Sequence, residues 1–185
     1  MFWIKVIDYN EATGKLKEIY EELIKKRGKI SNIMKVQSLN PTFMKLHMDL
    51  YINLMFQQAG LTREERELIA VVVSSANGCQ YCTNHHAEAL NHYWKDKDKL
   101  QKVIKDYKSI ELPDKIIKML NYAYKLTKNP NEIKQKDIDD LRKSGFSDED
   151  ILNINLIVSY FNLVNRIASG LGVEFTTEEV RGYKV

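Results

Sequence analysis

The stretch "TREERELIAVVVSSANGCQYCTNHHAEAL", residues 62–90, holds a helix start, a chain break and both cysteines of the sequence. Thr62 and Glu65 have the Ser/Thr-x-x-Glu spacing of a capping box, which begins a helix. The pair Asn77-Gly78 is typical of a break between two elements. We therefore expect one helix from about residue 62 and a second over 79–93.

The remaining sequence predicts an all-α fold. It has only three prolines and eight glycines, and its apolar residues recur three and four positions apart. Asn40-Pro41 predicts an N-cap followed by proline at the first helical position, Pro113 is expected at that position too, and Ser147 with Asp150 predicts another capped start. Helices should begin near 41, 62, 113 and 147, and should also cover about 11–26, 79–93, 97–107 and 136–144.

The length and composition predict one compact domain over residues 1–185, in which the half that contains the cysteines covers about 40–110. Hydrophobic residues make up 44% and charged residues 29% of the chain, and its net charge of +3 is too small to indicate a partner. Lysines alternate with acids, so we expect no nucleic-acid partner. The chain starts without a signal-peptide pattern, and its longest aliphatic run is "LIAVVV", so we expect a cytoplasmic protein without a membrane partner.

An internal repeat is a second hypothesis about the fold. "TREERELIAVVVSSAN" from Thr62 aligns without gaps with "SDEDILNINLIVSYFN" from Ser147, which belongs to an expected helix over about 147–169. Two pseudo-symmetric helical halves would explain the likeness, and so would the general similarity of capped amphipathic helices. The alignment places Glu67 opposite Leu152, which predicts a partly buried carboxyl group whose pKa is raised by burial.

The cysteine segment combines nucleophilic and basic side chains on one helix face. Cys79, Cys82 and His86 have the spacing i, i+3 and i+7, whereas His85 points off that face. Backbone N–H groups of the first helical turn favour a thiolate, and the imidazole one turn after Cys82 can assist ionisation. A second cysteine one turn away can convert an oxidised first one into a disulfide.

Metal binding and an inert buried pair are the alternatives at this point. Zinc requires ligands about 2 Å from the ion, and on one continuous helix Cys79 and His86 lie about 10 Å apart along the axis. Buried cysteines can also act as small hydrophobic residues. The CxxC spacing favours redox chemistry over both alternatives.

Glu67, Cys79, Cys82 and His86 together match the pattern E-x11-C-x-x-C-x3-H. This pattern resembles the signature of the alkylhydroperoxidase D (AhpD-like) family within the carboxymuconolactone decarboxylase superfamily, and most closely its peroxidase-related subgroup. The resemblance extends to the opening "WIKVIDYNEATGKLKEIYEE" and the closing "SYFNLVNRIASGLGVE", and so covers most of the chain.

The resemblance implies an all-helical homo-oligomer that reduces hydroperoxides. It implies that Cys82 is the peroxidatic thiolate, that Cys79 resolves it, and that Glu67 acts through His86 on the Cys82 proton, either directly or through water. Tyr81 stands where the family's founding enzyme has a histidine. Tyrosine titrates at about pH 10 in model peptides, so a tyrosine at this position is not expected to pass protons at neutral pH as the histidine would.

We therefore expect a thiol-dependent antioxidant peroxidase that needs no haem, flavin or metal and is reduced by an external dithiol. A CxxC dithiol–disulfide oxidoreductase without peroxide specificity is the second hypothesis. A non-catalytic helical oligomer with a metal-binding or inert Cys/His face is the third. A decarboxylase acting on a lactone is the most distant, since the decarboxylase members of the superfamily generally lack the cysteine pair.

Overall fold

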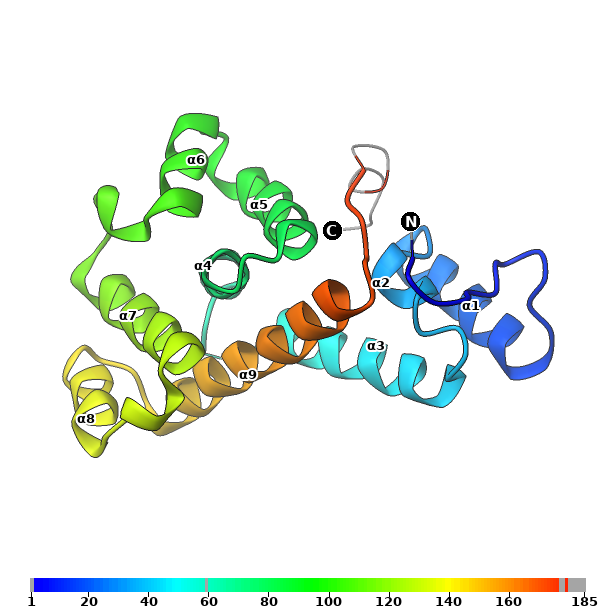
Figure 1. The fold of residues 1–185 in the computed structure, drawn as a ribbon. Helices are drawn as coiled ribbons and strands as arrows, with labels where there is room; N and C mark the ends of the chain where they lie inside the picture. Colours follow the sequence, from blue (N-terminus) through cyan, green and yellow to red (C-terminus); the bar gives the residue numbers. More distant parts are fainter. Residues whose placement is uncertain (1, 59, 177–178, 180–185) are drawn as a thin grey trace. The chain divides into compact units, whose positions relative to one another are not determined.

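The computed structural model describes residues 2–58, 60–176 and 179, and within them the chain is all-α, as the sequence predicts (Figure 1). No strand occurs in this described part. Two short 3-10 segments, η1 (Tyr107–Ser109) and η2 (Pro130–Glu132), accompany the α-helices. The α-helices are α1 (Gly14–Arg27), α2 (Asn32–Lys35), α3 (Pro41–Phe56), α4 (Arg63–Ala76), α5 (Gln80–Trp94), α6 (Lys97–Lys105), α7 (Asp114–Lys128), α8 (Gln135–Lys143) and α9 (Asp148–Gly170).

The predicted caps begin three of these helices. The Asn40 side chain accepts a hydrogen bond from the Phe43 N–H at 3.1 Å, and Thr62 forms the complete capping box of α4. Ser147 and Asp150 bond reciprocally in the same way at the start of α9. Pro113 differs from the prediction, because it is the N-cap residue of α7 and the helix itself starts at Asp114.

The chain divides into two compact units. The N-terminal unit consists of Met1–Asn53 together with Arg166–Val185, and the central unit consists of Leu54–Asn165. The boundaries fall inside α3 and α9, so each of these helices contributes residues to both units. The prediction of one domain over 1–185 remains a prediction, and the cysteine segment lies wholly within the central unit.

The N-terminal unit is built around an apolar cluster from α1, α2 and α3. Its buried members are Ala12, Leu16, Ile19, Tyr20, Leu23, Met34, Met44 and Met48. Tyr20 lies within it and donates a hydrogen bond to the Ile7 carbonyl at 2.8 Å. Burial raises the pKa of the Tyr20 hydroxyl to about 12, so the hydroxyl stays protonated and keeps this bond.

Helix α4 is the central helix of the central unit, where α5, α6 and α7 pack against it (Figure 1). Every residue from Arg66 to Ser74 is buried. A helix that is buried on all sides has a continuous apolar run in place of one apolar stripe, which explains "LIAVVV". The buried Arg66 donates to the Leu54 carbonyl at 2.7 Å and to the Leu61 carbonyl at 3.1 Å.

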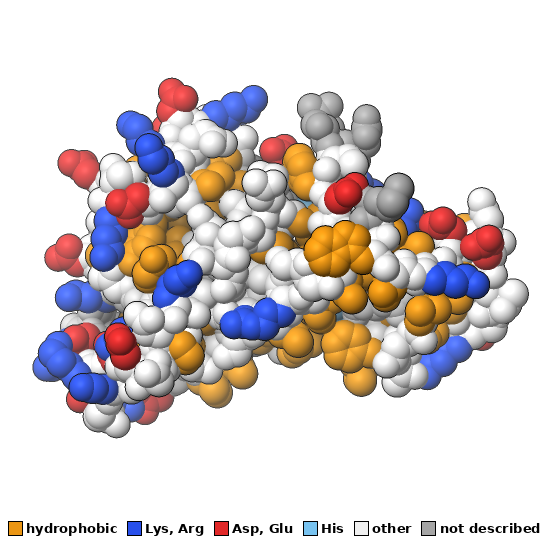
Figure 2. All heavy atoms as spheres, in the orientation of Figure 1, with side chains coloured by type: hydrophobic (Ala, Val, Ile, Leu, Met, Phe, Trp, Pro, Cys, Tyr) orange, Lys and Arg blue, Asp and Glu red, His pale blue; other side chains and the backbone are white. Residues whose placement is uncertain are grey.

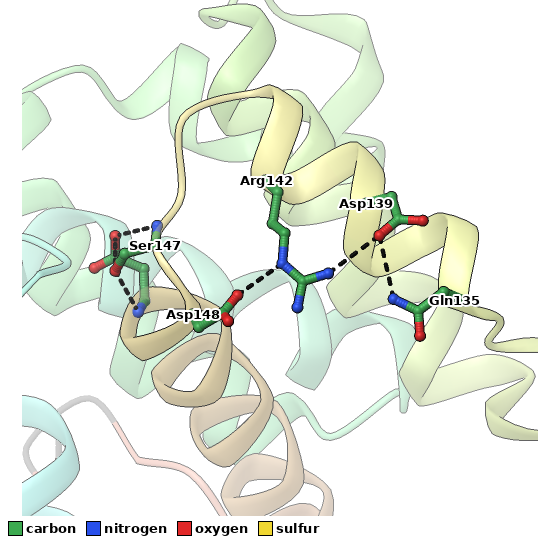
Figure 3. A network of polar contacts seen from close by, with 6 residues as sticks. Gln135, Asp139, Arg142, Ser147 and Asp148 are labelled. Carbon is green, nitrogen blue, oxygen red and sulfur yellow. Dashed lines mark hydrogen bonds and ion pairs between the residues drawn. The ribbon is translucent and has the colours of Figure 1, made fainter.

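Helix α8 is joined to the start of α9 by a polar network around Arg142 (Figure 3). Arg142 donates to Asp148 at 2.7 Å and to Asp139 at 3.1 Å, and Gln135 donates to the same Asp139 oxygen. Asp148 lies in the first turn of α9, where a negative charge is favourable. On the face shown in Figure 2, acidic and basic side chains are likewise interspersed.

The two aligned segments form α4 and the first part of α9, and they differ after the aligned asparagines. Helix α4 ends at Ala76, whereas α9 continues through the equivalent position to a length of 23 residues. Leu152 is 56% exposed, although its aligned partner Glu67 is completely buried. Asn77 nevertheless donates a hydrogen bond to its aligned counterpart Asn162 at 3.1 Å.

Helix α9 is long and apolar enough to cross a membrane by length and composition alone. In the most apolar 18-residue stretch of this helix, 56% of the residues are buried inside the structure. Its buried residues include Ile154, Ile157 and Phe161. We therefore interpret α9 as a core helix.

Candidate active site

The break between α4 and α5 places the cysteines. Gly78 has a φ of 69°, in the left-handed region that glycine adopts at little cost. The Cys79 N–H then bonds to the Ser74 carbonyl at 3.0 Å, which ties the break to the end of α4. As a result Cys79 is the N-cap of α5 and Cys82 is its third residue.

The two cysteine side chains are buried and adjacent. Cys79 is 3% and Cys82 is 2% exposed, and both side chains are in the thiol form. Their sulfur atoms lie 2.7 Å apart, and the Cys82 N–H donates to the Cys79 sulfur at 3.4 Å. A disulfide requires about 2.05 Å between the sulfurs, so the two sulfur atoms already lie close to bonding distance.

The pKa of the Cys82 thiol is raised, which differs from the thiolate expected at a helix start. The hydrogen bond with Cys79 is the main cause, and burial is the second. The side chain of Asn165 and the backbone N–H of Cys82 act in the opposite direction through hydrogen bonds. Cys82 is therefore a thiol that needs a base before it can react as a nucleophile.

Glu67 and His86 are in direct contact, which the sequence left open. His86 Nδ1 lies 2.7 Å from Glu67 Oε2, so no bridging water is needed. The Glu67 side chain is fully buried and that of His86 is 14% exposed. A carboxylate at Nδ1 holds the proton on that nitrogen and leaves Nε2 as the nitrogen that can accept another proton.

Arg63 is a member of the site that the sequence analysis missed. Its Nε and Nη2 atoms donate to Glu67 Oε1 at 2.8 and 2.5 Å. Arg63 also donates to the Met55 carbonyl at 3.2 Å and lies 3.8 Å over the Phe56 ring. The sequence could have predicted this ion pair, because Arg63 precedes Glu67 by four residues on one helix, and opposite charges at that spacing lie side by side.

The carboxyl group of Glu67 is ionised in this setting. Burial alone raises its pKa, but the charges and hydrogen bonds of His86 and Arg63 outweigh burial and hold the pKa below its ordinary value. The expectation of a raised Glu67 pKa is therefore wrong. The reason is that His86, and after it Arg63, lower the pKa of this carboxyl group by more than burial raises it.

His86 and Tyr81 have different surroundings. The His86 ring meets the buried Phe161 edge-on, with ring centroids 4.5 Å apart, which fixes the imidazole plane. His86 lies one turn after Cys82 on α5, and a proton transfer between the two remains a prediction. Tyr81 is 5% exposed and packs against His85 with centroids 4.4 Å apart.

These side chains provide a dithiol and, one turn later on α5, the imidazole of a carboxylate–imidazole pair. The pair can accept a proton at His86 and stabilise the resulting positive charge through Glu67. The adjacent sulfurs can exchange two electrons by forming a disulfide. Among residues 2–58, 60–176 and 179, no group of three His, Cys, Asp or Glu side chains is placed to hold a metal ion.

Comparisons with known proteins agree on one fold. The family model described as the carboxymuconolactone decarboxylase family matches residues 41–123. A solved structure from Ralstonia eutropha JMP134, described as an alkylhydroperoxidase AhpD core and an uncharacterized peroxidase-related protein, is 29% identical. The match covers 99% of this chain and 98% of that one, with a TM-score of 0.86.

Two further structures extend the comparison. A peroxidase-related protein from Silicibacter sp. TM1040 is 32% identical, over 89% of this chain and 86% of that one, with a TM-score of 0.81. The debrominase Bmp8 in complex with 2,3,4-tribromopyrrole is 18% identical over 95% and 92% of the two chains, with a TM-score of 0.78, which shows a common fold only. A comparison with curated protein sequences gave no significant match.

Proposed function

Because this chain belongs to the AhpD-like branch of the carboxymuconolactone decarboxylase superfamily, we propose that it is a thiol-dependent peroxidase. The proposal rests on the cysteine pair at the start of α5 together with the Glu67–His86 contact. Both features lie in the central unit, and in the proposed reaction Cys82 is the nucleophile, Cys79 the resolving thiol and His86 the base.

In the first step, Cys82 reduces the hydroperoxide. His86 takes the Cys82 proton, and the thiolate attacks the terminal oxygen of R–O–OH. An S–O bond forms, the O–O bond breaks, and the leaving alkoxide takes a proton from His86 and departs as the alcohol. The sulfur is now a sulfenic acid, which has lost two electrons to the peroxide.

In the second step, Cys79 closes the disulfide. Its sulfur attacks the Cys82 sulfenic acid, the S–O bond breaks, and the hydroxyl leaves as water with the Cys79 proton. The 2.7 Å separation of the sulfurs supports this step because the two reacting atoms are already adjacent. An external dithiol then returns both cysteines to thiols by disulfide exchange.

Arg63 and Glu67 prepare His86 for this role. The carboxylate orients the ring and stabilises its protonated form, and the arginine keeps the carboxylate ionised although it is buried. The raised pKa of Cys82 makes the base necessary, because few thiols are ionised at neutral pH. No haem, flavin or metal takes part in these steps.

Peroxidase turnover with a dithiol reductant tests the proposal. We expect Cys82→Ser to lose turnover. Glu64→Ala is the control, because Glu64 lies on the same helix but bonds to Trp94 Nε1 at 2.6 Å, away from the cysteines. Equal turnover of the two variants would overturn the assignment of Cys82.

A dithiol–disulfide oxidoreductase remains the second candidate, because the adjacent sulfurs suit disulfide exchange as well as peroxide reduction. Reduction of insulin disulfides without any consumption of hydroperoxide would favour it. Both functions require a compartment in which cysteines are reduced, so we propose the cytoplasm.

We also propose that the protein is a homo-oligomer. Leu152, Leu156 and Leu163 lie on one face of α9 and are 56%, 41% and 44% exposed. Exposed leucines at helical spacing suit a protein–protein contact. A second copy of the chain is the partner that the family resemblance implies.

A further inference from the structure

A series of hydrogen-bonded asparagine side chains leads to the cysteine pair. Unlike His86, these side chains supply hydrogen-bond donors and no base. Asn165 is 1% exposed and donates to the Ser74 hydroxyl at 3.1 Å. Asn77 donates to Asn165 at 2.9 Å and to Asn162 at 3.1 Å. Asn162 in turn donates to Thr127 at 3.1 Å. The side chain of Asn165 also forms a hydrogen bond with Cys82.

The donor and acceptor of each hydrogen bond in this asparagine series are determined by Asn162, the residue farthest from the cysteines. The Val158 carbonyl can only accept, so the amide nitrogen of Asn162 must point toward it, at 3.0 Å. The Asn162 oxygen therefore accepts from Asn77, which uses its second N–H on the oxygen of Asn165. The Asn165 oxygen is thereby occupied, and its nitrogen faces Ser74 and Cys82.

The hydrogen count of Asn165 then assigns the bond to the sulfur. An amide nitrogen has two hydrogens, and one of them goes to the Ser74 hydroxyl. The second is available for the Cys82 sulfur, so Asn165 is the donor and the sulfur is the acceptor. A donor favours the thiolate over the thiol, and in a buried setting such a charge-assisted bond is strengthened.

We propose that Asn165 is a further residue of the site, whose amide N–H binds the Cys82 sulfur and stabilises it as a thiolate. The proposal rests on the proposed role of Cys82 as the reacting cysteine. Asn77 is then a positioning residue, since it acts on Cys82 only by fixing the orientation of the Asn165 amide.

The acidity of Cys82 tests the proposal without any peroxide. In the Cys79→Ser background, Cys82 is the sole cysteine, because the chain has two. Its rate of alkylation by iodoacetamide, measured from about pH 5 to about pH 10, follows the fraction of thiolate and so compares the Cys82 pKa between variants. Asn165→Asp keeps the shape but replaces the donor by a charged acceptor, so the uncharged Asn77→Ala described below separates the loss of the donor from the effect of the added charge. We expect the pKa of Cys82 to rise by about one unit, which makes alkylation about tenfold slower at neutral pH.

Asn153→Asp in the same background is the matched control. Asn153 is also a buried asparagine of α9, but it accepts from Gln57 at 2.9 Å and has no bond to a cysteine. We expect its alkylation profile to equal that of the parent. If Asn165→Asp has the same profile as Asn153→Asp, the proposal is overturned.

Asn77→Ala keeps the test decisive if Asn165→Asp does not fold. It releases the Asn165 amide from its fixed orientation, so we expect a smaller shift of the Cys82 pKa in the same direction. An unchanged pKa in Asn77→Ala contradicts the ordered asparagine series. Because alkylation requires no hydroperoxide, these results stand apart from the peroxidase assay, and either proposal can fail alone.

Discussion

Glu67 is the residue on which the proposed proton transfer depends most. Glu67→Gln keeps the size of the side chain but removes the charge that orients His86 and pairs with Arg63. Residues that orient a reacting group in this way typically contribute 10- to 100-fold, so we expect kcat/KM for hydroperoxide to fall about 10- to 100-fold. Glu64→Gln removes a carboxylate from the same helix and should leave kcat/KM unchanged.

The stability of the protein should depend on pH through the same carboxyl group. The pKa of Glu67 is lower in the folded than in the unfolded protein, so as the pH falls the unfolded chain takes up the proton first. The stabilisation is complete above the unfolded pKa of about 4.3 and is lost as the pH falls through the folded pKa. Urea unfolding of wild type and Glu67→Gln should differ by about 3 kcal/mol at pH 7 and converge in acid. A constant difference across this range would contradict the ionised state of Glu67.

Single residues were predictable from the sequence where spacing alone brings them together. Cys79 and Cys82 meet because they share one helical turn, whereas the contact between Glu67 and His86 depends on how α4 and α5 pack and could not be predicted from spacing. The predicted direction of the Glu67 pKa shift was wrong because that shift depends on the contacts with His86 and Arg63 as well as on burial. Asn165 could not be found, because its contact with α4 and α5 joins residues more than 80 positions apart and depends on tertiary packing.

At the level of elements, the start of α5 depends on Gly78. Alanine at a φ of 69° costs roughly 1–2 kcal/mol, and no neighbouring atom lies within 4 Å of the added Cβ, so backbone strain is the whole effect. We expect Gly78→Ala to lower the free energy of unfolding by about 1 kcal/mol. Urea unfolding monitored by circular dichroism measures it.

Gly170→Ala is the control for this prediction. Gly170 also has free space around its Cβ position, but it lies in helix α9 without a positive φ. Alanine favours a helix over glycine, so stability should stay equal or rise slightly. Equal destabilisation by both substitutions would contradict the prediction, because the positive φ of Gly78 would then not be the cause of the loss of stability.

Helix boundaries were predictable wherever a cap marked them, as at Thr62 and Ser147. Helix α2 (Asn32–Lys35) was missed because four residues are too short to show a helical period. The alignment of α4 with α9 predicted that Glu67 is buried because its counterpart is a leucine. Glu67 is buried, but that leucine, Leu152, is exposed, so the reason was wrong. Sequence periodicity gives the pattern of a helix, whereas burial on all sides of α4 depends on which helices surround it.

At the level of the whole molecule, the exposed leucines of α9 predict self-association. We expect the wild type to elute as an oligomer in size-exclusion chromatography with light scattering. Leu156→Lys places a charge in the middle of the leucine face and should shift the protein toward the monomer. Glu88→Lys, an exposed substitution on α5, should leave the mass unchanged. A monomeric wild type would contradict the proposed oligomer.

Mass spectrometry of the cysteines tests the central claim most directly. Reduced wild type and Cys79→Ser are each treated with one equivalent of cumene hydroperoxide. We predict that the wild type loses two hydrogens as a Cys79–Cys82 disulfide, whereas Cys79→Ser gains one oxygen as a Cys82 sulfenic acid. If both thiols of the wild type stay reduced, Cys82 does not react with hydroperoxides and the protein is not a thiol peroxidase.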